Sequence, residues 1–285
     1  MAIDVSQRIL KLYPTLSKGH KKIANAILND YDKVAYMTAS RLGNRVGVSE
    51  STVVRFAGIL GFDGYSELQH AIQELVKIKL TPNQRIEITK QRMGKGDILE
   101  NVMHSDINKI RYTLDNIDRD AFHACIDAIL EADKIYIMGA RSSEPVAKIL
   151  QYNLSMIFDN VKFVTATSGA EVFEQMFSIN EHDVLIAFSF PRYSSKVVNA
   201  IKFAESKNAA TIAITDSPIS PIAKHAKYLL KAQSDMASFM DSLVAPISII
   251  NAIIVEITRR CETTITERFD RLEKLWDEYD VYTKH

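Results

Sequence analysis

The spacing of apolar residues changes along the chain and divides it into two parts. Up to about residue 76, apolar residues recur every three or four positions, as in helices that bury one face. From about residue 135, short β-branched runs that are apolar throughout alternate with helical patterns, which is typical of strands covered on both faces of a parallel sheet. The pattern predicts an all-α N-terminal domain followed by an α/β domain with a doubly wound parallel sheet.

The boundary between the two parts is predicted where the apolar stripe fades. Between Ile78 and Gly96 the stripe is lost, and Pro82 and Gly94 indicate breaks. We therefore expect a helical domain over residues 1–77, a linker over 78–97 and the α/β domain over 98–285. The expected helices are Val5 to Tyr13, Lys18 to Asn29, Val34 to Met37, two short helices within 38–60, Tyr65 to Lys77, 98–116, 119–132, Ser238 to Arg259 and Thr264 to Tyr282. The expected strands are Ile135 to Met138, Val161 to Val164, Val184 to Phe188, Thr211 to Thr215 and Tyr228 to Leu230.

Residues 38–60 have the spacing of a DNA-reading helix-turn-helix, with two short helices joined at residues 47–49. Gly47 supplies a permissive backbone at the corner, and Val48 enters the small core between the helices. Ser49 can cap the second helix by accepting from the amide of Ser51 or Thr52. For this segment alone, an ordinary helical hairpin in a core is the alternative.

Polar side chains project from the N-terminal part of the second helix, the part that meets base edges in the major groove. Lysines and arginines around it can contact backbone phosphates. The candidate DNA-binding residues are Lys21, Lys22, Arg41, Arg45, Ser49, Glu50, Ser51, Thr52 and Arg55. The chain has 35 Lys and Arg against 35 Asp and Glu, yet cations outnumber anions within residues 1–80. This asymmetry favours double-stranded DNA as the partner of the first domain.

Two hydroxyl-rich loops follow predicted strands of the α/β domain, at residues 139–143 and 189–195. Each leads into a predicted helix, so backbone amides, the positive helix end, serine hydroxyls and an arginine converge on an anion site. A phosphate monoester fits best, because its oxygens accept several hydrogen bonds while an arginine balances the charge. For one such loop alone, helix capping without a ligand is the alternative. The candidate ligand-binding residues are Gly139, Arg141, Ser142, Ser143, Ser189, Arg192, Ser194 and Ser195.

The cysteines, the histidines and the absence of certain motifs exclude several classes of protein. Cys125 and Cys261 are the only cysteines, which excludes a disulfide framework, and the histidines show no metal-ligand spacing. Neither a dinucleotide-binding motif nor a P-loop occurs, so we expect no metal and no cofactor. No basic stretch followed by an apolar run opens the chain, and no apolar run approaches about 18 residues. We expect a cytoplasmic protein without membrane contact.

Strings in both parts resemble one family of bacterial proteins. They are residues 38–42, 46–56, 60–62 and 65–68 in the first part, and 139–143, 189–194, 212–218 and 220–223 in the second. Through them the chain resembles the RpiR/MurR family of transcription regulators, which join an N-terminal helix-turn-helix domain to a C-terminal sugar isomerase (SIS) domain. Arg141 departs from the family pattern, which commonly has glycine in this loop.

The resemblance implies a regulator of sugar-metabolism genes whose DNA affinity responds to a phosphorylated sugar. Hydroxyls matching Ser142, Ser143, Ser189 and Ser194 would hold this sugar phosphate. The resemblance also implies a homodimer or a higher homo-oligomer formed through the SIS domain. A dimer would present two recognition helices to a roughly palindromic operator.

An isomerase that uses the same SIS pocket is the alternative function. Isomerisation of a sugar phosphate needs a positioned base that shuttles a proton beside the carbonyl. Glu144, Glu171 and His225 are the conceivable bases. The sequence leaves open which sugar phosphate binds, which operator is recognised, and whether the ligand releases or recruits the protein.

Overall fold

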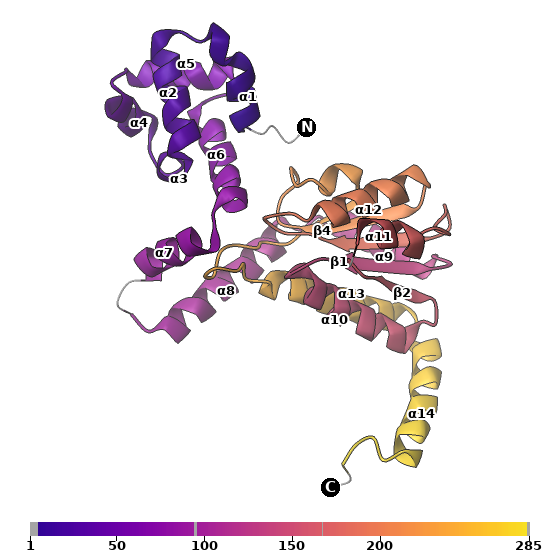
Figure 1. The fold of residues 1–285 in the computed structure, drawn as a ribbon. Coiled ribbons are helices and arrows are strands. Elements are labelled where there is room, and N and C mark those ends of the chain that lie inside the picture. The colour runs from indigo at the N-terminus through magenta and orange to yellow at the C-terminus, as the bar shows by residue number, and fades with distance from the viewer. Residues whose placement is uncertain (1–4, 94–95, 167, 284–285) are drawn as a thin grey trace. The chain divides into compact units, whose positions relative to one another are not determined.

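A computed structural model describes residues 5–93, 96–166 and 168–283 of the chain. Its contacts divide the chain into two compact units, residues 1–92 and 93–285, and Figure 1 labels their elements. In the described part of the first unit every regular element is helical, and the second unit holds a five-stranded parallel sheet with its helices. The predicted order, a helical domain followed by a parallel α/β domain, is confirmed.

The elements have the following bounds. In the first unit they are α1 (Val5–Leu12), η1 (Tyr13–Thr15), α2 (Lys18–Asn29), α3 (Tyr31–Val34), α4 (Ala39–Val46), α5 (Glu50–Ile59) and α6 (Tyr65–Lys79), followed by α7 (Pro82–Met93). In the second unit they are α8 (Ile98–Asn116), α9 (Arg119–Leu130), β1 (Ile135–Gly139), α10 (Ser143–Ile157), β2 (Val161–Val164), α11 (Gly169–Gln175), β3 (Val184–Phe188), α12 (Ser195–Ser206), β4 (Ala210–Thr215), η2 (Ala223–His225), β5 (Tyr228–Lys231), α13 (Val244–Arg260) and α14 (Glu262–Glu278).

The core of the first unit is built from one face of each amphipathic helix. Ile23 and Ile27 of α2, Leu42 of α4, Phe56 of α5 and Ile72 of α6 have no exposed surface. Each such side chain stabilises the fold by about 1.5–3 kcal/mol through its removal from water. The α4–α5 pair is therefore held by a shared core and not by its turn alone.

The second unit is organised by the order of its strands, β2-β1-β3-β4-β5. β1 pairs with β3 along its whole length, from Ile135 opposite Val184 to Gly139 opposite Phe188. The chain proceeds from β1 to β2 on one side and from β3 to β4 on the other, so the strand order reverses between β1 and β3. The loops that follow β1 and β3 therefore emerge side by side at the carboxyl edge of the sheet.

Helices cover both faces of this sheet. On one face α9, α10 and α13 pack against a cluster that includes Ile137 and Ile186. On the other face α11 and α12 pack against a cluster that includes Tyr136 and Leu185. The helix that follows β1 and the helix that follows β3 thus lie on opposite faces, which is the doubly wound arrangement that the sequence predicts.

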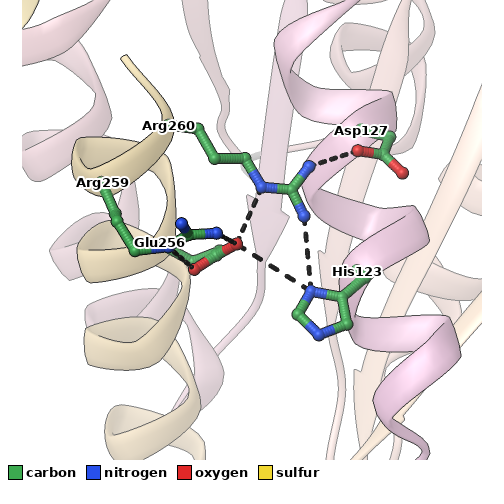
Figure 2. A network of polar contacts seen from close by, with 5 residues as sticks. All are labelled: His123, Asp127, Glu256, Arg259 and Arg260. Carbon is green, nitrogen blue, oxygen red and sulfur yellow. Dashed lines mark hydrogen bonds and ion pairs between the residues drawn. The ribbon is translucent and has the colours of Figure 1, made fainter. Parts of the chain in front are cut away.

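A network of ion pairs joins α9 to α13 (Figure 2). Glu256 accepts hydrogen bonds from Arg259 and Arg260, both at distances down to 2.8 Å. Arg260 also pairs with Asp127 and lies 3.3 Å from His123 Nδ1. The hydrogen bonds from Arg259 and then Arg260 lower the pKa of Glu256 to about 2. Glu256 is therefore charged throughout the physiological pH range and holds Arg260 beside Asp127 of α9.

The apolar helix near the C-terminus begins later than its sequence pattern predicts. The pattern predicts a start at Ser238, but α13 begins at Val244, and a bridge between Met236 and Asp241 closes a turn before it. Pro246 explains this start, since proline is tolerated in the first helical turn but clashes with the preceding turn further inside a helix.

The segment predicted as a linker, residues 78–97, contains a helix of its own. α6 continues to Lys79, and α7 follows after two residues with Pro82 at its first position. Proline suits this position because its fixed φ fits the helix and its missing N–H would have no helical partner.

The described residues include two free cysteines and show neither a metal cluster nor a helix suited to cross a membrane. Cys125 is buried and Cys261 half-buried, both are free thiols, and burial raises the pKa of Cys125 to about 12. In these residues no group of three His, Cys, Asp or Glu side chains could hold a metal ion. Across the same ranges, no helix combines the length and apolar character that crossing a membrane requires.

Candidate functional site

The first candidate site is the helix-turn-helix of α4 and α5, whose turn is fixed by local residues. Gly47 ends α4 at φ +68°, in the left-handed region that glycine adopts without strain. Ser49 caps α5 by accepting from the backbone N–H of Thr52 at 3.3 Å. Thr38 caps α4 in the same way, by accepting from the N–H of Arg41 at 3.2 Å. Of the two amides that the sequence offers to Ser49, the structure selects that of Thr52.

Gly43 lets the turn lie directly against α4, a role that the sequence reasoning missed. A Cβ on Gly43 would lie 2.8 Å from the carbonyl oxygen of Val48. The N–H of Val48 donates to the oxygen of Gly43 at 2.9 Å, which brings the two backbones together. The available signal was a glycine in a helix interior, where glycine is unfavourable unless its small size is needed.

The N-terminal half of α5 presents polar side chains to solvent. Glu50, Ser51 and Arg55 are exposed, and Thr52 is half-buried. Ser49 Oγ lies 2.9 Å from Ser51 Oγ and 2.8 Å from Thr52 Oγ1, so three hydroxyls form one cluster at the start of the helix. This accessible half is the part of a recognition helix that contacts base edges.

The candidate phosphate-binding cations differ in their exposure to solvent and in the contacts that they already make. Lys22 and Arg41 are exposed, while Lys21 is half-buried with its Nζ over an aromatic ring. Arg45 Nη2 lies 2.6 Å from Asp30 Oδ2, which joins α4 to the end of α2. This ion pair competes with any phosphate contact that Arg45 makes.

The second candidate site lies at the carboxyl edge of the sheet, between the loops 139–143 and 189–195. In doubly wound sheets ligands bind in the crevice where the strand order reverses, which here is between β1 and β3. α10 and α12 begin on either side of this crevice, because they cover opposite faces of the sheet. Their N-terminal amides carry partial positive charge and favour an anion there.

Four hydroxyls flank this crevice, and we call Ser142, Ser143, Ser189 and Ser194 the crevice serines. Ser142 and Ser194 occupy the N-cap positions of α10 and α12, but neither side chain makes a capping hydrogen bond. By contrast, the N-cap serines of α2, α5 and α11 all accept one. The capping explanation of these two serines therefore does not hold.

The other serines of the two loops differ in burial. Ser143 and Ser189 are 4% and 2% exposed, and Ser195 is exposed. The carbonyl of Ser189 accepts from Thr215 Oγ1 at 2.6 Å, which fixes the start of the second loop. In the part of the chain that the structure describes, no hydrogen bond involves the hydroxyls of Ser143, Ser189 or Ser195.

Gly139 is required by packing. A Cβ on Gly139 would lie 2.5 Å from the carbonyl oxygen of Ser143 and 2.9 Å from the Cβ of Ala147. The first turn of α10 therefore rests on the end of β1. This close approach brings the N-terminus of α10 to the crevice, whether or not Gly139 itself contacts a ligand.

Arg141 and Arg192 share an unusual backbone conformation. Their φ angles are +56° and +66°, and both side chains are exposed. For a residue other than glycine the left-handed conformation costs about 1–2 kcal/mol. Strain of this kind collects at ligand sites, where the surrounding structure holds a side chain in place for its function.

Two further side chains tie the crevice loops to their neighbours, and the sequence reasoning assigned no role to either. Tyr193 OH donates to Asp216 Oδ1 at 3.0 Å, which links the second loop to the end of β4. Lys196 Nζ donates to the carbonyl of Ala166 at 2.6 Å, which links α12 to the segment after β2. Lys196 also brings a cation to the first turn of α12, and its position in that turn was the available signal.

Of the three residues considered as isomerase bases, Glu144 and Glu171 lie in the first turns of α10 and α11, and His225 lies at the other end of the sheet. Glu144 forms an ion pair with Lys148 at 2.7 Å on the surface of α10. His225 pairs with Glu205 at 2.6 Å, and its carbonyl accepts from Thr211 near the amino end of β4. That end is opposite to the carboxyl edge where the crevice lies.

Two family models match the chain. The model described as "Helix-turn-helix domain, rpiR family" matches residues 3–77, and the model described as "SIS domain" matches residues 128–256. Among the relatives, an uncharacterized HTH-type transcriptional regulator of Haemophilus influenzae is 27% identical over 89% of this chain and 90% of its own length. The HTH-type transcriptional regulator HexR of Escherichia coli is 23% identical over 95% of this chain and 94% of its own length.

Solved structures agree with this fold. The NanR protein of Vibrio vulnificus, complexed with ManNAc-6P, has a TM-score of 0.61 at 18% identity and covers 96% of this chain and 98% of its own. The sugar isomerase domain of an RpiR transcription factor from Sphaerobacter thermophilus has a TM-score of 0.59 at 25% identity, covering 61% of this chain and 97% of its own.

The fold and its helix-turn-helix define the class, a two-domain transcription regulator that carries a SIS domain. Its relatives are named as regulators, and its N-terminal domain is one that binds DNA, so the chain is a regulator and not an isomerase. Within this class, its first domain belongs to the rpiR family of helix-turn-helix domains, and its second domain is similar in fold to that of an RpiR transcription factor.

Proposed function

We propose that the SIS domain binds a phosphorylated sugar at the crevice between β1 and β3, and that this binding changes the affinity of the helix-turn-helix domain for operators of sugar-metabolism genes. The crevice serines and the N-terminal amides of α10 and α12 hold the phosphate oxygens. Arg141 or Arg192 balances the phosphate charge. The ligand acts by its difference in affinity for two arrangements of the DNA-binding domains.

The observation that carries this proposal is the unused capping capacity of Ser142 and Ser194. Both stand where a serine normally caps a helix, and among the residues that the structure describes neither hydroxyl makes a hydrogen bond, although the N-cap serines of α2 and α11 do. Two unbonded hydroxyls at two helix N-termini, on opposite sides of one crevice, fit a ligand with several acceptor oxygens. The binding of ManNAc-6P by NanR, a protein of the same fold, supports a sugar phosphate as the ligand class.

A thermal-shift screen of sugar phosphates and amino-sugar phosphates tests the proposal, because a ligand that binds only the folded protein raises its melting temperature. We expect one compound to raise the melting temperature. The same compound should give little or no shift with Ser142→Ala or Ser194→Ala, since each variant loses a charge-assisted hydrogen bond of about 1.5–3 kcal/mol.

Ser206→Ala provides the matched control. Ser206 ends α12, whereas Ser194 precedes its first residue, and its hydroxyl donates to the carbonyl of Phe203 at 2.7 Å. This variant should keep the full ligand-induced shift. A screen in which no sugar phosphate stabilises the wild-type protein would count against the proposed ligand class.

We expect Arg55 of α5 to contact bases and Arg41 of α4 to contact phosphates, so their alanine variants should affect DNA binding differently. We expect Arg55→Ala to weaken binding to the operator by about 1–3 kcal/mol and to leave non-operator DNA nearly unaffected. Arg41→Ala should weaken both DNAs alike and lower the dependence of affinity on salt by about one unit of slope. Titrations at several salt concentrations measure both effects, and equal losses on both DNAs for Arg55→Ala would contradict a base contact.

We also propose that the protein acts as a homodimer. The two recognition helices of a dimer would each bind one half-site of a roughly palindromic operator. The two-fold axis of the protein would then coincide with that of the DNA.

A further inference from the structure

We propose that residues 272–282, which are the outer half of α14 and the turn that follows it and are together called the outer half, form the surface through which two copies of this chain pair, with their α14 helices antiparallel. The inference rests on the homodimer of the proposed function and assigns its contact surface. It uses residues remote in sequence from both candidate sites.

The base of α14 is fixed to its own domain. Ile265 is buried, and Phe269 packs against the core of the sheet. Arg268 donates to the carbonyl of Met156 and to Asp159 Oδ1, both at 2.8 Å. From this anchored base the helix extends away from the rest of the second unit (Figure 1). The direction of its outer half is therefore set by the fold.

The outer half carries an apolar stripe that its own chain leaves open. Leu272, Leu275, Trp276 and Tyr279 follow the i, i+3, i+4, i+7 spacing of one helix face. Leu275 and Tyr279 are 48% and 70% exposed, and Leu272 and Trp276 are half-buried. Isolated helices of this length are marginal in water, so a stripe of this kind calls for a packing partner.

Contacts within the chain already hold the aromatic side chains of the stripe in place. The ring of Trp276 meets the ring of Tyr282 edge-on at 5.5 Å and lies 6.4 Å from that of Phe269. Side chains that are already held lose little conformational entropy on association.

Charge complementarity indicates a second copy as the partner. Arg271 and Glu278 stand seven residues apart, on the same flank of the stripe. In an antiparallel pair whose two-fold axis passes between residues 274 and 275, Arg271 of each copy faces Glu278 of the other, and the Leu275 side chains of the two copies lie near the axis. In a parallel pair the same flanks would lie on opposite sides of the seam, so Arg271 and Glu278 would not face each other. A two-fold interface requires a self-complementary surface of this kind.

The available area fits a small specific interface. The outer half carries three aromatic side chains, Trp276, Tyr279 and Tyr282. Fully exposed, six aromatics at about 150–250 Å² each would supply about 900–1,500 Å², and because Trp276 is half-buried and Tyr279 and Tyr282 are 70% and 63% exposed they supply less. A typical stable complex buries about 1,200–2,000 Å². A dimer that dissociates on dilution is therefore expected.

Sedimentation velocity of the full-length protein over a dilution series tests the inference, with Trp276 as an internal reporter because the chain has one tryptophan. We expect its emission to shift to the red over the same concentrations at which the dimer dissociates. Arg271→Glu should raise the dimer dissociation constant at least about 10-fold, and Leu275→Asp at least about 30-fold. The double variant Arg271→Glu with Glu278→Arg should return it to within about threefold of wild type.

Variants of exposed apolar residues elsewhere on the unit are the controls. Val255→Asp on α13 and Ile107→Asp on α8 replace side chains that are 67% and 47% exposed and should leave the dimer intact. The inference is overturned by a dimer that the α14 variants leave unchanged. It is equally overturned by a dimer that is lost in either control, because the contact would then lie on α13 or α8. Neither result bears on the proposal that the SIS domain binds a sugar phosphate, because the thermal-shift screen tests that binding independently.

Discussion

Replacing Gly139 by alanine should lower the free energy of unfolding of the second unit by about 3 kcal/mol. The added Cβ would lie 2.5 Å from the carbonyl oxygen and 2.8 Å from the carbonyl carbon of Ser143, and these backbone atoms cannot rotate away. To relieve the contact, the first turn of α10 must move off the end of β1. Because Ser142 and Ser143 move with this turn, the sugar-phosphate shift should be lost together with stability.

Hydrogen exchange followed by mass spectrometry checks this prediction, since it reports the opening of each segment separately. Amides of β1 and α10 should exchange faster in Gly139→Ala. Gly169→Ala is the matched control: Gly169 begins α11, and its added Cβ would meet nothing within 4 Å. It should be neutral or stabilising by less than about 1 kcal/mol. Equal behaviour of the two variants would show that α10 does not rest on β1 as described.

Replacing Gly43 by alanine should destabilise the first unit by about 2 kcal/mol and weaken operator binding at least about tenfold. The added Cβ would lie 2.8 Å from the carbonyl oxygen of Val48, inside the turn between α4 and α5. Relief of this contact requires α5 to move relative to α4. The α5 residues that we propose to contact bases would then no longer be held in register with the α4 residues that we propose to contact phosphates.

Gly58→Ala is the control for this variant. Gly58 lies in the last turn of the recognition helix, and a Cβ there would meet nothing within 4 Å. This substitution should stabilise the helix by about 0.5–1 kcal/mol, because alanine loses less backbone entropy than glycine. Unfolding by urea and titration with operator DNA measure the pair. Full operator affinity in Gly43→Ala would contradict the coupling between the turn and DNA recognition.

Local signals predicted much of both candidate sites. The cap by Ser49 and the left-handed Gly47 follow from residues within a few positions of each other, and both appear in the structure. The hydroxyl-rich loops were found in the same way, because each directly follows an apolar strand and precedes a helix. The role of Gly43, the ion pair of Arg45 with Asp30 and the links made by Tyr193 and Lys196 could not be found like this, since they join segments whose distance is set by packing.

The sequence by itself determined the two-domain order, the helix-turn-helix and the parallel sheet, because apolar periodicity, caps and turn residues act over a few neighbouring positions. Only the tertiary structure decided that β1 lies beside β3, that the crevice serines flank one crevice and that Gly139 seats α10 on its strand. Strand order and backbone contact depend on how distant segments pack against each other, and that information is spread over the whole core.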